Sequence, residues 1–384
     1  MKYFLCILIV GVTVGLGVSY DYVKSSEQFS SQIYQEVVKK VVVKNSQQNF
    51  IVSPASAQLT LSLLSLGAKG RTAFELDNVL ALPVDPIEIK TLAQKTANYF
   101  KKSESFQFLS ENQIFTDQSV SIKKSFQKDT KDIYQSDVQS LSFSNKRRSA
   151  RIINDWVEQR TGNIAENIIN EQNFGQDTKI VVVNAVQFKP RWQTPFYVIG
   201  PKIFTTGNGR SFYSSHIQAS DFFNYYYNEE LDAQFVEIPF DANDVVLTIV
   251  VPQNVSGLCN LEKSIEIVLS EQPYHRRYTY VRIPKFRIET TVNFATLLPL
   301  LGARTPFSQS ANFGKITGQK ICLNKVLQKG LIQVCETKDG NNKLDLLPSS
   351  FTHEVIADRP FIYYLRHKEL GILLVGRYVQ SSFV

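Results

Sequence analysis

The stretch NFIVSPASAQLTLSLLSLGAKGRT, residues 49–72, decides the fold class of this chain. Three apolar residues, Phe50 to Val52, predict a short strand. Ser53 and Pro54 then open a helix, since proline is tolerated in a first helical turn. From there to Gly67 the residues are apolar or polar without charge. A helix without charge on any face is expected to be buried.

Helical and strand patterns on either side of this stretch are unevenly distributed along the chain. Helical periodicity is found over residues 27–44, 72–80, 87–101, 123–134 and 149–160. Strand patterns cover residues 106–115, 138–143, 179–188, 211–227, 234–239, 245–251, 278–288, 331–334, 361–366 and 372–378. The valine-rich run 179–188 is typical of a central strand covered on both faces. Helices in the first half and strands in the second predict one α+β domain.

The composition excludes several classes of protein. The chain has 384 residues, of which 43% are hydrophobic and 20% charged, with a formal net charge of +7. It has no low-complexity segment, so disorder, collagen and coiled coil are excluded for most of its length. The basic residues are scattered among acidic ones, which favours solubility over nucleic-acid binding.

The first 19 residues predict a secretory signal peptide. Lys2 is followed by an apolar run to Val18, and small residues at Gly17 and Ser19 fit a cleavage site. The alternative is a membrane anchor, but the run is short for a span. We therefore expect residues 20–384 to form a single extracellular domain without a membrane segment.

The cysteines and one sequon fit an extracellular chain without a disulfide framework. Removal of the signal would leave Cys259, Cys322 and Cys335, an odd number, and we expect them to be buried free thiols. Asn254 begins the glycosylation sequon Asn254-Val255-Ser256 in a predicted surface loop.

The sequence contains no signature of an enzyme, a metal site or a cofactor site. Nucleophile-elbow, zinc-protease, P-loop and dinucleotide-binding motifs are all absent. We therefore expect no catalytic activity, cofactor or metal. Four basic groups indicate weak binding of a polyanion such as a glycosaminoglycan, although such groups are more often solvated: Lys101-Lys102, Lys123-Lys124, Lys146-Arg147-Arg148 and Arg276-Arg277.

Several stretches together resemble one family, the serpins. The resemblance starts with residues 49–56 and 66–72 and continues in family order to the C-terminus. Its other landmarks are Asn154-Asp155-Trp156-Val157, Thr161-Gly162-Asn163-Ile164, Val183-Asn184-Ala185-Val186-Gln187-Phe188 with Trp192 and Pro195-Phe196, Ile283-Pro284-Lys285-Phe286, Leu301-Gly302, Asn324-Lys325-Val326, Ala357-Asp358-Arg359-Pro360-Phe361 and Gly376-Arg377. Any one of these matches is weak, but the set is specific.

The resemblance implies three β-sheets, eight or nine helices and an exposed reactive-centre loop, here about residues 336–358. In inhibitory members a serine protease cleaves this loop, which then inserts into the main sheet and traps the acyl-enzyme. The resemblance also implies a buried polar cluster beneath the loop, the shutter, formed by Ser53, Ser56, Asn184 and Gln328. Gln328 stands where the family usually has histidine. We expect a monomer.

The hinge of the loop departs from the family pattern. Inhibitory hinges carry a Glu, a variable residue, Gly, Thr or Ser, and then a run of small residues. Here the corresponding residues are Glu336, Thr337, Lys338, Asp339, Gly340, Asn341 and Asn342, followed by Lys343. Insertion would bury charge on either face of the new strand, and an unpaired buried charge costs several kcal/mol.

Two functional hypotheses follow. The leading one is a secreted serpin that is non-inhibitory or substrate-like and acts by binding an extracellular serine protease or another secreted protein. The alternative is a suicide inhibitor of an extracellular serine protease. The loop is shorter than usual, so counts from its two ends place the reactive bond at different residues, Ser349 or Thr352.

Overall fold

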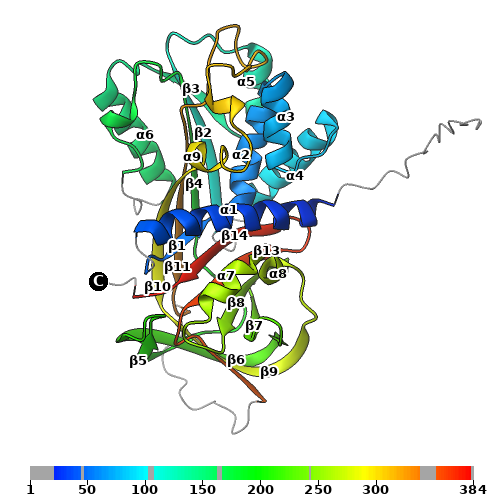
Figure 1. Cartoon of the computed structure of the whole chain (residues 1–384), viewed down its shortest axis with the longest axis vertical. Helices are drawn as coiled ribbons and strands as arrows, with labels where there is room; N and C mark the ends of the chain where they lie inside the picture. The colour runs from blue at the N-terminus through cyan, green and yellow to red at the C-terminus, as the bar shows by residue number, and fades with distance from the viewer. Residues whose placement is uncertain are drawn as a thin grey trace, which may run out of the picture.

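The computed structural model describes residues 21–381 except 45–46, 103–107, 162–166, 242–243 and 338–351 (Figure 1). Its α-helices are α1 (Tyr22–Lys44), α2 (Pro54–Gly67), α3 (Gly70–Val79), α4 (Pro86–Lys102), α5 (Lys124–Asp132), α6 (Lys146–Arg160), α7 (Leu258–Lys263), α8 (Ile265–Leu269) and α9 (Phe294–Leu297). The nine helices of this described part confirm the predicted number.

The strands are β1 (Phe50–Val52), β2 (Phe108–Asp117), β3 (Asp137–Leu141), β4 (Ile180–Phe188), β5 (Tyr197–Thr205), β6 (Ser211–Asn228), β7 (Ala233–Pro239), β8 (Val245–Pro252), β9 (His275–Pro284), β10 (Phe286–Asn293), β11 (Lys325–Val334), β12 (His353–Ile356), β13 (Phe361–His367) and β14 (Gly371–Tyr378). Helices dominate the first half and strands the second, as the α+β prediction requires.

Helix α2 forms as its uncharged sequence predicts. Ser53 precedes it, and its hydroxyl accepts a hydrogen bond from the amide of Ser56 at 3.3 Å, which caps the helix. All but one residue of the helix is buried. Its apolar residues pack in the main core beneath the two sheets, so the helix is an internal support for the strands.

A five-stranded sheet with the order β10-β11-β4-β2-β3 carries the centre of the molecule. Strands β4 and β11 are parallel neighbours, paired from Val181 and Lys325 to Phe188 and Ile332. Both faces of β4 are covered: Val182 and Val186 lie in the main core, and Val181 and Val183 lie in a second core beneath α6. Two-sided burial explains why β4 is a nearly continuous apolar run.

The other nine strands join in a second hydrogen-bonded array, β1-β14-β13-β8-β7-β6-β9-β12, with β5 paired to β6. Strand β6 is 18 residues long and links two parts of this array. Its C-terminal end pairs with β7, and its N-terminal portion pairs with β5 and β9. The second and third predicted sheets are thus continuous through β6.

One predicted strand is wrong. The pattern over residues 278–288 belongs to two strands in different sheets, β9 in the nine-stranded array and β10 in the five-stranded sheet. The break falls at Pro284 and Lys285, because proline has no amide hydrogen to continue a strand ladder. β11 is longer than the predicted 331–334, and β5, β12, α7 and α8 were not predicted.

The described helices include none that is both long and apolar enough to cross a membrane. Residues 1–19 lie outside the described part, so the predicted signal peptide stays a prediction.

Candidate functional site: the strand gap

The candidate site is the junction between β4 and β11, which we call the strand gap. Strand β11 ends at Val334, and residues 335–337 lead to the segment 338–351. The chain resumes at Thr352 and enters β12, at the edge of the nine-stranded array. The reactive loop therefore starts from the central sheet and returns to a different one. Lys338, Asp339, Gly340, Asn341, Asn342 and Ser349 lie outside the described residues.

The predicted shutter residues lie together beneath the middle of the strand gap, and all are buried. The side chain of Gln328 accepts a hydrogen bond from Ser53 N at 2.7 Å and donates to Ser53 O at 2.9 Å and Asn184 Oδ1 at 2.6 Å. Asn184 Nδ2 in turn donates to Ser56 Oγ at 2.5 Å. These contacts connect both strands of the gap to the start of α2.

The sequence did not reveal that β2 completes this cluster. Asn184 Nδ2 also donates to Asn112 Oδ1 at 2.8 Å, and the hydroxyls of Ser56 and Ser110 are 2.5 Å apart. Asn112 and Asn184 are direct partners in the pairing of β2 with β4. The shutter side chains are all amides and hydroxyls, so the cluster has no group that titrates near neutral pH.

The end of the strand gap at the C-termini of β4 and β11 is held by contacts to the hinge. Trp192 Nε1 donates to Cys335 O at 2.8 Å, and Thr337 N donates to Phe196 O at 3.1 Å. Phe196 N donates back to Thr337 Oγ1 at 3.0 Å. The turn after β4, which the sequence marked by Trp192 and Phe196, thereby fixes where the reactive loop leaves the sheet.

Glu336 forms an ion pair at the same end of the gap. Its carboxylate lies 2.7 Å from Lys285 Nζ, at the break between β9 and β10. Burial alone would raise the pKa of Glu336, but the hydrogen bond and charge of Lys285 outweigh it, so the pKa lies below its usual value. The family landmark Ile283-Pro284-Lys285-Phe286 thus contributes a hinge contact as well as a strand break.

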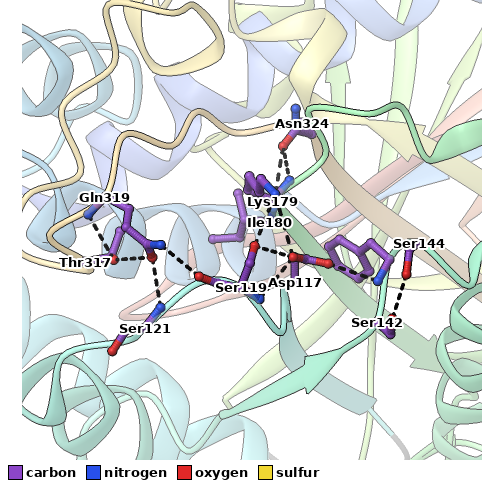
Figure 2. Close-up of polar contacts among 11 residues, drawn as sticks. Asp117, Ser119, Ser121, Ser142, Ser144, Lys179, Ile180, Thr317, Gln319 and Asn324 are labelled. Atoms are coloured by element: carbon purple, nitrogen blue, oxygen red, sulfur yellow. Dashed lines mark hydrogen bonds and ion pairs between the residues drawn. The ribbon is translucent and has the colours of Figure 1, made fainter.

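Side-chain contacts close the opposite end of the gap, at the N-termini of β4 and β11 (Figure 2). Asn324, just before β11, accepts hydrogen bonds through Oδ1 from Lys179 N at 2.9 Å and Ile180 N at 3.5 Å, at the start of β4. Lys179 Nζ is also 3.7 Å from Asp117 at the end of β2. Burial would raise the pKa of Asp117, but hydrogen bonds led by those from Ser119, with the charge of Lys179, lower it.

The remaining candidate residues lie away from the gap. Thr352 is exposed, and both its amide and its hydroxyl donate to Tyr278 O, at 3.2 and 3.0 Å. Asn254 is exposed in a turn between β8 and α7. The expectation of buried thiols is wrong: Cys259 is exposed, Cys322 and Cys335 are half-buried, and none of the three forms a disulfide.

The four basic groups lie on four elements, α4, α5, α6 and β9, or directly before them. Among the described residues no group of three or more histidine, cysteine, aspartate or glutamate side chains could hold a metal ion.

The fold and the gap define a class of protein: an α+β domain in which the central strand β11 is followed, after residues 338–351, by a strand of another sheet. A sequence profile described as serpin, serine protease inhibitor, matches residues 24–381. The chain belongs to the serpin family.

Individual relatives agree with this assignment. The chain is 28% identical over 352 residues to serine protease inhibitor 42Dd of Drosophila melanogaster, covering 88% of this chain and 92% of the relative. It is 27% identical over 354 residues to leukocyte elastase inhibitor of Bos taurus, covering 87% and 93%.

Solved structures agree as well. The crystal structure of Serpin48, a highly specific serpin of the insect Tenebrio molitor, matches with a TM-score of 0.82 and 28% identity, over 95% of this chain and all of that one. Native protease nexin-1 with heparin matches with a TM-score of 0.78 and 26% identity, over 93% and 99%.

Proposed function

We propose that this serpin presents its loop to an extracellular serine protease and is cleaved mainly as a substrate, because the hinge does not insert readily into the strand gap. The observation that carries the proposal is the charge of the hinge residues, because an inserted hinge would have to separate β4 from β11, which now pair directly, and lie between them.

Both faces of an inserted strand would be covered over much of the gap. On one side lie the shutter and the main core, which includes Val182 and Ile332. On the other lies the second core beneath α6, which includes Val183 and Leu327. A strand placed between β4 and β11 therefore exchanges water for packed apolar side chains on both faces.

The hinge residues are poorly suited to that environment. One alternating set is Asp339, Asn341, Lys343 and Asp345, and the other is Lys338, Gly340, Asn342 and Leu344. Each set contains charge, and an uncompensated buried charge costs several kcal/mol. Slow insertion would leave time for water to hydrolyse the acyl-enzyme, which releases active protease and a cleaved serpin.

Of the two candidate reactive bonds, we favour the one at Ser349. The amide and hydroxyl of Thr352 are both bonded to Tyr278 O, so that residue is already part of the approach to β12. A protease needs an extended segment whose backbone is free to pair with its own cleft.

The second candidate function is inhibition of an extracellular serine protease. The gap between β4 and β11 is closed, without an inserted strand among the described residues, and the described base of the hinge is bonded to the turn after β4. This is the arrangement that an inserting serpin needs before cleavage, and the family description and the names of relatives point the same way.

One experiment separates the two functions. The protein is mixed with trypsin-, chymotrypsin- and elastase-like proteases, and the products are analysed on denaturing gels and by mass spectrometry. The proposal predicts loop cleavage, retained protease activity and no covalent complex. An SDS-stable complex with any of these proteases would establish the inhibitor instead.

We also propose that the chain is secreted as a monomer and carries a glycan at Asn254. The first 19 residues and the exposure of the Asn254 sequon support this. Expression in insect cells should release into the culture medium a protein that begins at Tyr20. This protein should lose mass on treatment with an N-glycosidase. Retention in the cell, or a mass equal to that of the Asn254→Gln variant, would argue against it.

A further inference from the structure

A pocket lined by four lysines lies among α3, α4, α5 and the segment before β11. Lys69 precedes α3, Lys90 is in α4, Lys123 precedes α5, and Lys315 belongs to the segment before β11. We call these four residues the lysine pocket. Helices α3, α4 and α5 gather at the upper end of the molecule in Figure 1. The pocket has a volume of about 380 Å³.

Backbone hydrogen bonds fix three of the lysines relative to one another. Lys69 N donates to Asn312 O at 2.9 Å, and Lys315 N donates to Gly67 O at 3.1 Å. Lys123 N donates to Ile316 O at 2.8 Å. The segment around Gly314 is therefore held between the ends of two helical regions.

The lysine side chains converge on Gly314. Lys123 Nζ donates to Gly314 O at 2.5 Å. A side-chain carbon placed on Gly314 would lie 3.4 Å from the Cδ atom of Lys69, so the stem of Lys69 passes over this glycine. The ammonium group of Lys123 and the aliphatic stem of Lys69 thus approach the same short stretch of chain.

The carboxylates nearby do not balance this positive charge. Asp129, which also lines the pocket, is paired with Lys90 at 2.7 Å. Asp77 lies within electrostatic reach of Lys315 and accepts a hydrogen bond from Ser65. Lys69 and Lys123 have no ion pair with a described carboxylate. The pocket therefore carries an excess of two positive charges.

We propose that the lysine pocket binds a compact anion with two or more phosphate or sulfate groups. Lysine ammonium groups act as point charges suited to such oxyanions. The volume falls in the range of small-ligand sites, and the apolar lining residues Leu63, Leu66 and Phe126 can contact a sugar or cyclitol ring. The four basic groups evident in the sequence contribute only Lys123 to this site.

The test measures binding of inositol hexakisphosphate, a trisulfated heparin disaccharide and inorganic phosphate by calorimetry. The pocket variant is Lys69→Gln/Lys123→Gln/Lys315→Gln. The control variant Lys202→Gln/Arg210→Gln/Lys263→Gln removes the same charge from exposed residues of β5, the turn before β6, and α7. Thermal unfolding shows that each variant is folded, and Lys69→Gln alone replaces the triple variant if it is not.

Binding of the organic probe should weaken roughly tenfold in the pocket variant and less than about twofold in the control, since each exposed ion pair contributes modestly. The tighter of the two organic probes identifies phosphate or sulfate as the natural group. Equal weakening in both variants, or no binding of either organic probe at about 50 mM salt, would overturn the proposal. Neither result affects the account of the reactive loop.

Discussion

Gln328 and Asn184 are direct partners across the parallel pair β11 and β4, and their side-chain amides are joined by a hydrogen bond of 2.6 Å. This contact crosses the line along which the sheet would have to open. Because Gln328 also binds both backbone polar groups of Ser53, one side chain connects the two central strands to the start of α2.

Replacement of Gln328 by leucine should lower the free energy of unfolding by about 2–4 kcal/mol, because it removes the hydrogen-bond partner of two buried polar atoms, Ser53 N and Asn184 Oδ1. Denaturant unfolding measures the change. The matched control is Gln333→Leu on the same strand, where the side chain is half-exposed, and we expect a change below about 0.5 kcal/mol there. Equal losses in the two variants would refute the role of the shutter.

The lowered pKa of Glu75 predicts that the free energy of unfolding decreases at acidic pH. Burial would raise its pKa, but hydrogen bonds from Arg71, Thr305 and Arg304 lower the pKa to about 2 from an ordinary 4.5. A lowered pKa in the folded state means that this stabilisation is present above about 4.5 and is lost as the pH falls towards 2. Glu75→Gln should therefore flatten the acid limb of the stability curve.

The measurement for Glu75 is denaturant unfolding at a series of pH values. At neutral pH the Glu75→Gln variant should be less stable by about 2 kcal/mol, since the carboxylate receives charge-assisted hydrogen bonds. Glu88→Gln, at an exposed position in the first turn of α4, serves as the control. If both variants keep the parent's acid limb, the assignment to Glu75 is wrong.

The ion pair of Glu336 with Lys285 should hold the base of the loop at neutral pH. Its contribution is present above the ordinary pKa of glutamate, 4.5, and disappears as the pH falls through the lowered value. Glu336→Gln should speed hydrogen exchange of the Thr337 amide, which is bonded to Phe196 O. Glu354→Gln, exposed on β12, should leave that rate unchanged. Unchanged exchange in Glu336→Gln would contradict the role of this ion pair.

The sequence predicts those helices and strands whose local pattern of apolar and polar residues is clear. Helix α2 and strand β4 are read correctly because an uncharged helix and a valine-rich run each follow from burial on all sides. The strand at 278–288 was misread because apolar character continues across Pro284 while the chain changes sheets. β5 contains Gly200 and Pro201 and has mostly exposed side chains, so it carries little periodic signal.

The site was only partly predictable for the same reason. Ser53, Ser56, Asn184 and Gln328 were grouped through the family resemblance, and they do lie together. Asn112 and Ser110 were missed because no local pattern shows that β2 is the neighbour of β4. The partner of Glu336, Lys285, lies about fifty positions away, and only the folded sheet brings the two charges into contact.

The charged and amide residues of the hinge oppose its insertion between β4 and β11. A variant that restores small residues tests the cause directly: Lys338→Gly, Asp339→Thr, Asn341→Ala, Asn342→Ala, Lys343→Ala and Asp345→Ala combined. Cleaved in the loop, this variant should gain a strand and unfold at a markedly higher temperature than before cleavage.

The most direct measurement is thermal unfolding of the unaltered protein before and after loop cleavage. In domains of about 150–250 residues about 1 kcal/mol shifts Tm by roughly 2–4 °C, and by less in a larger domain. A strand added to the sheet contributes several such increments, so its effect on Tm would be measurable. We expect cleavage to change Tm by less than about 3 °C in the unaltered protein and to raise it in the hinge variant. A rise of more than about 10 °C in the unaltered protein would show that the loop inserts, and would contradict the account.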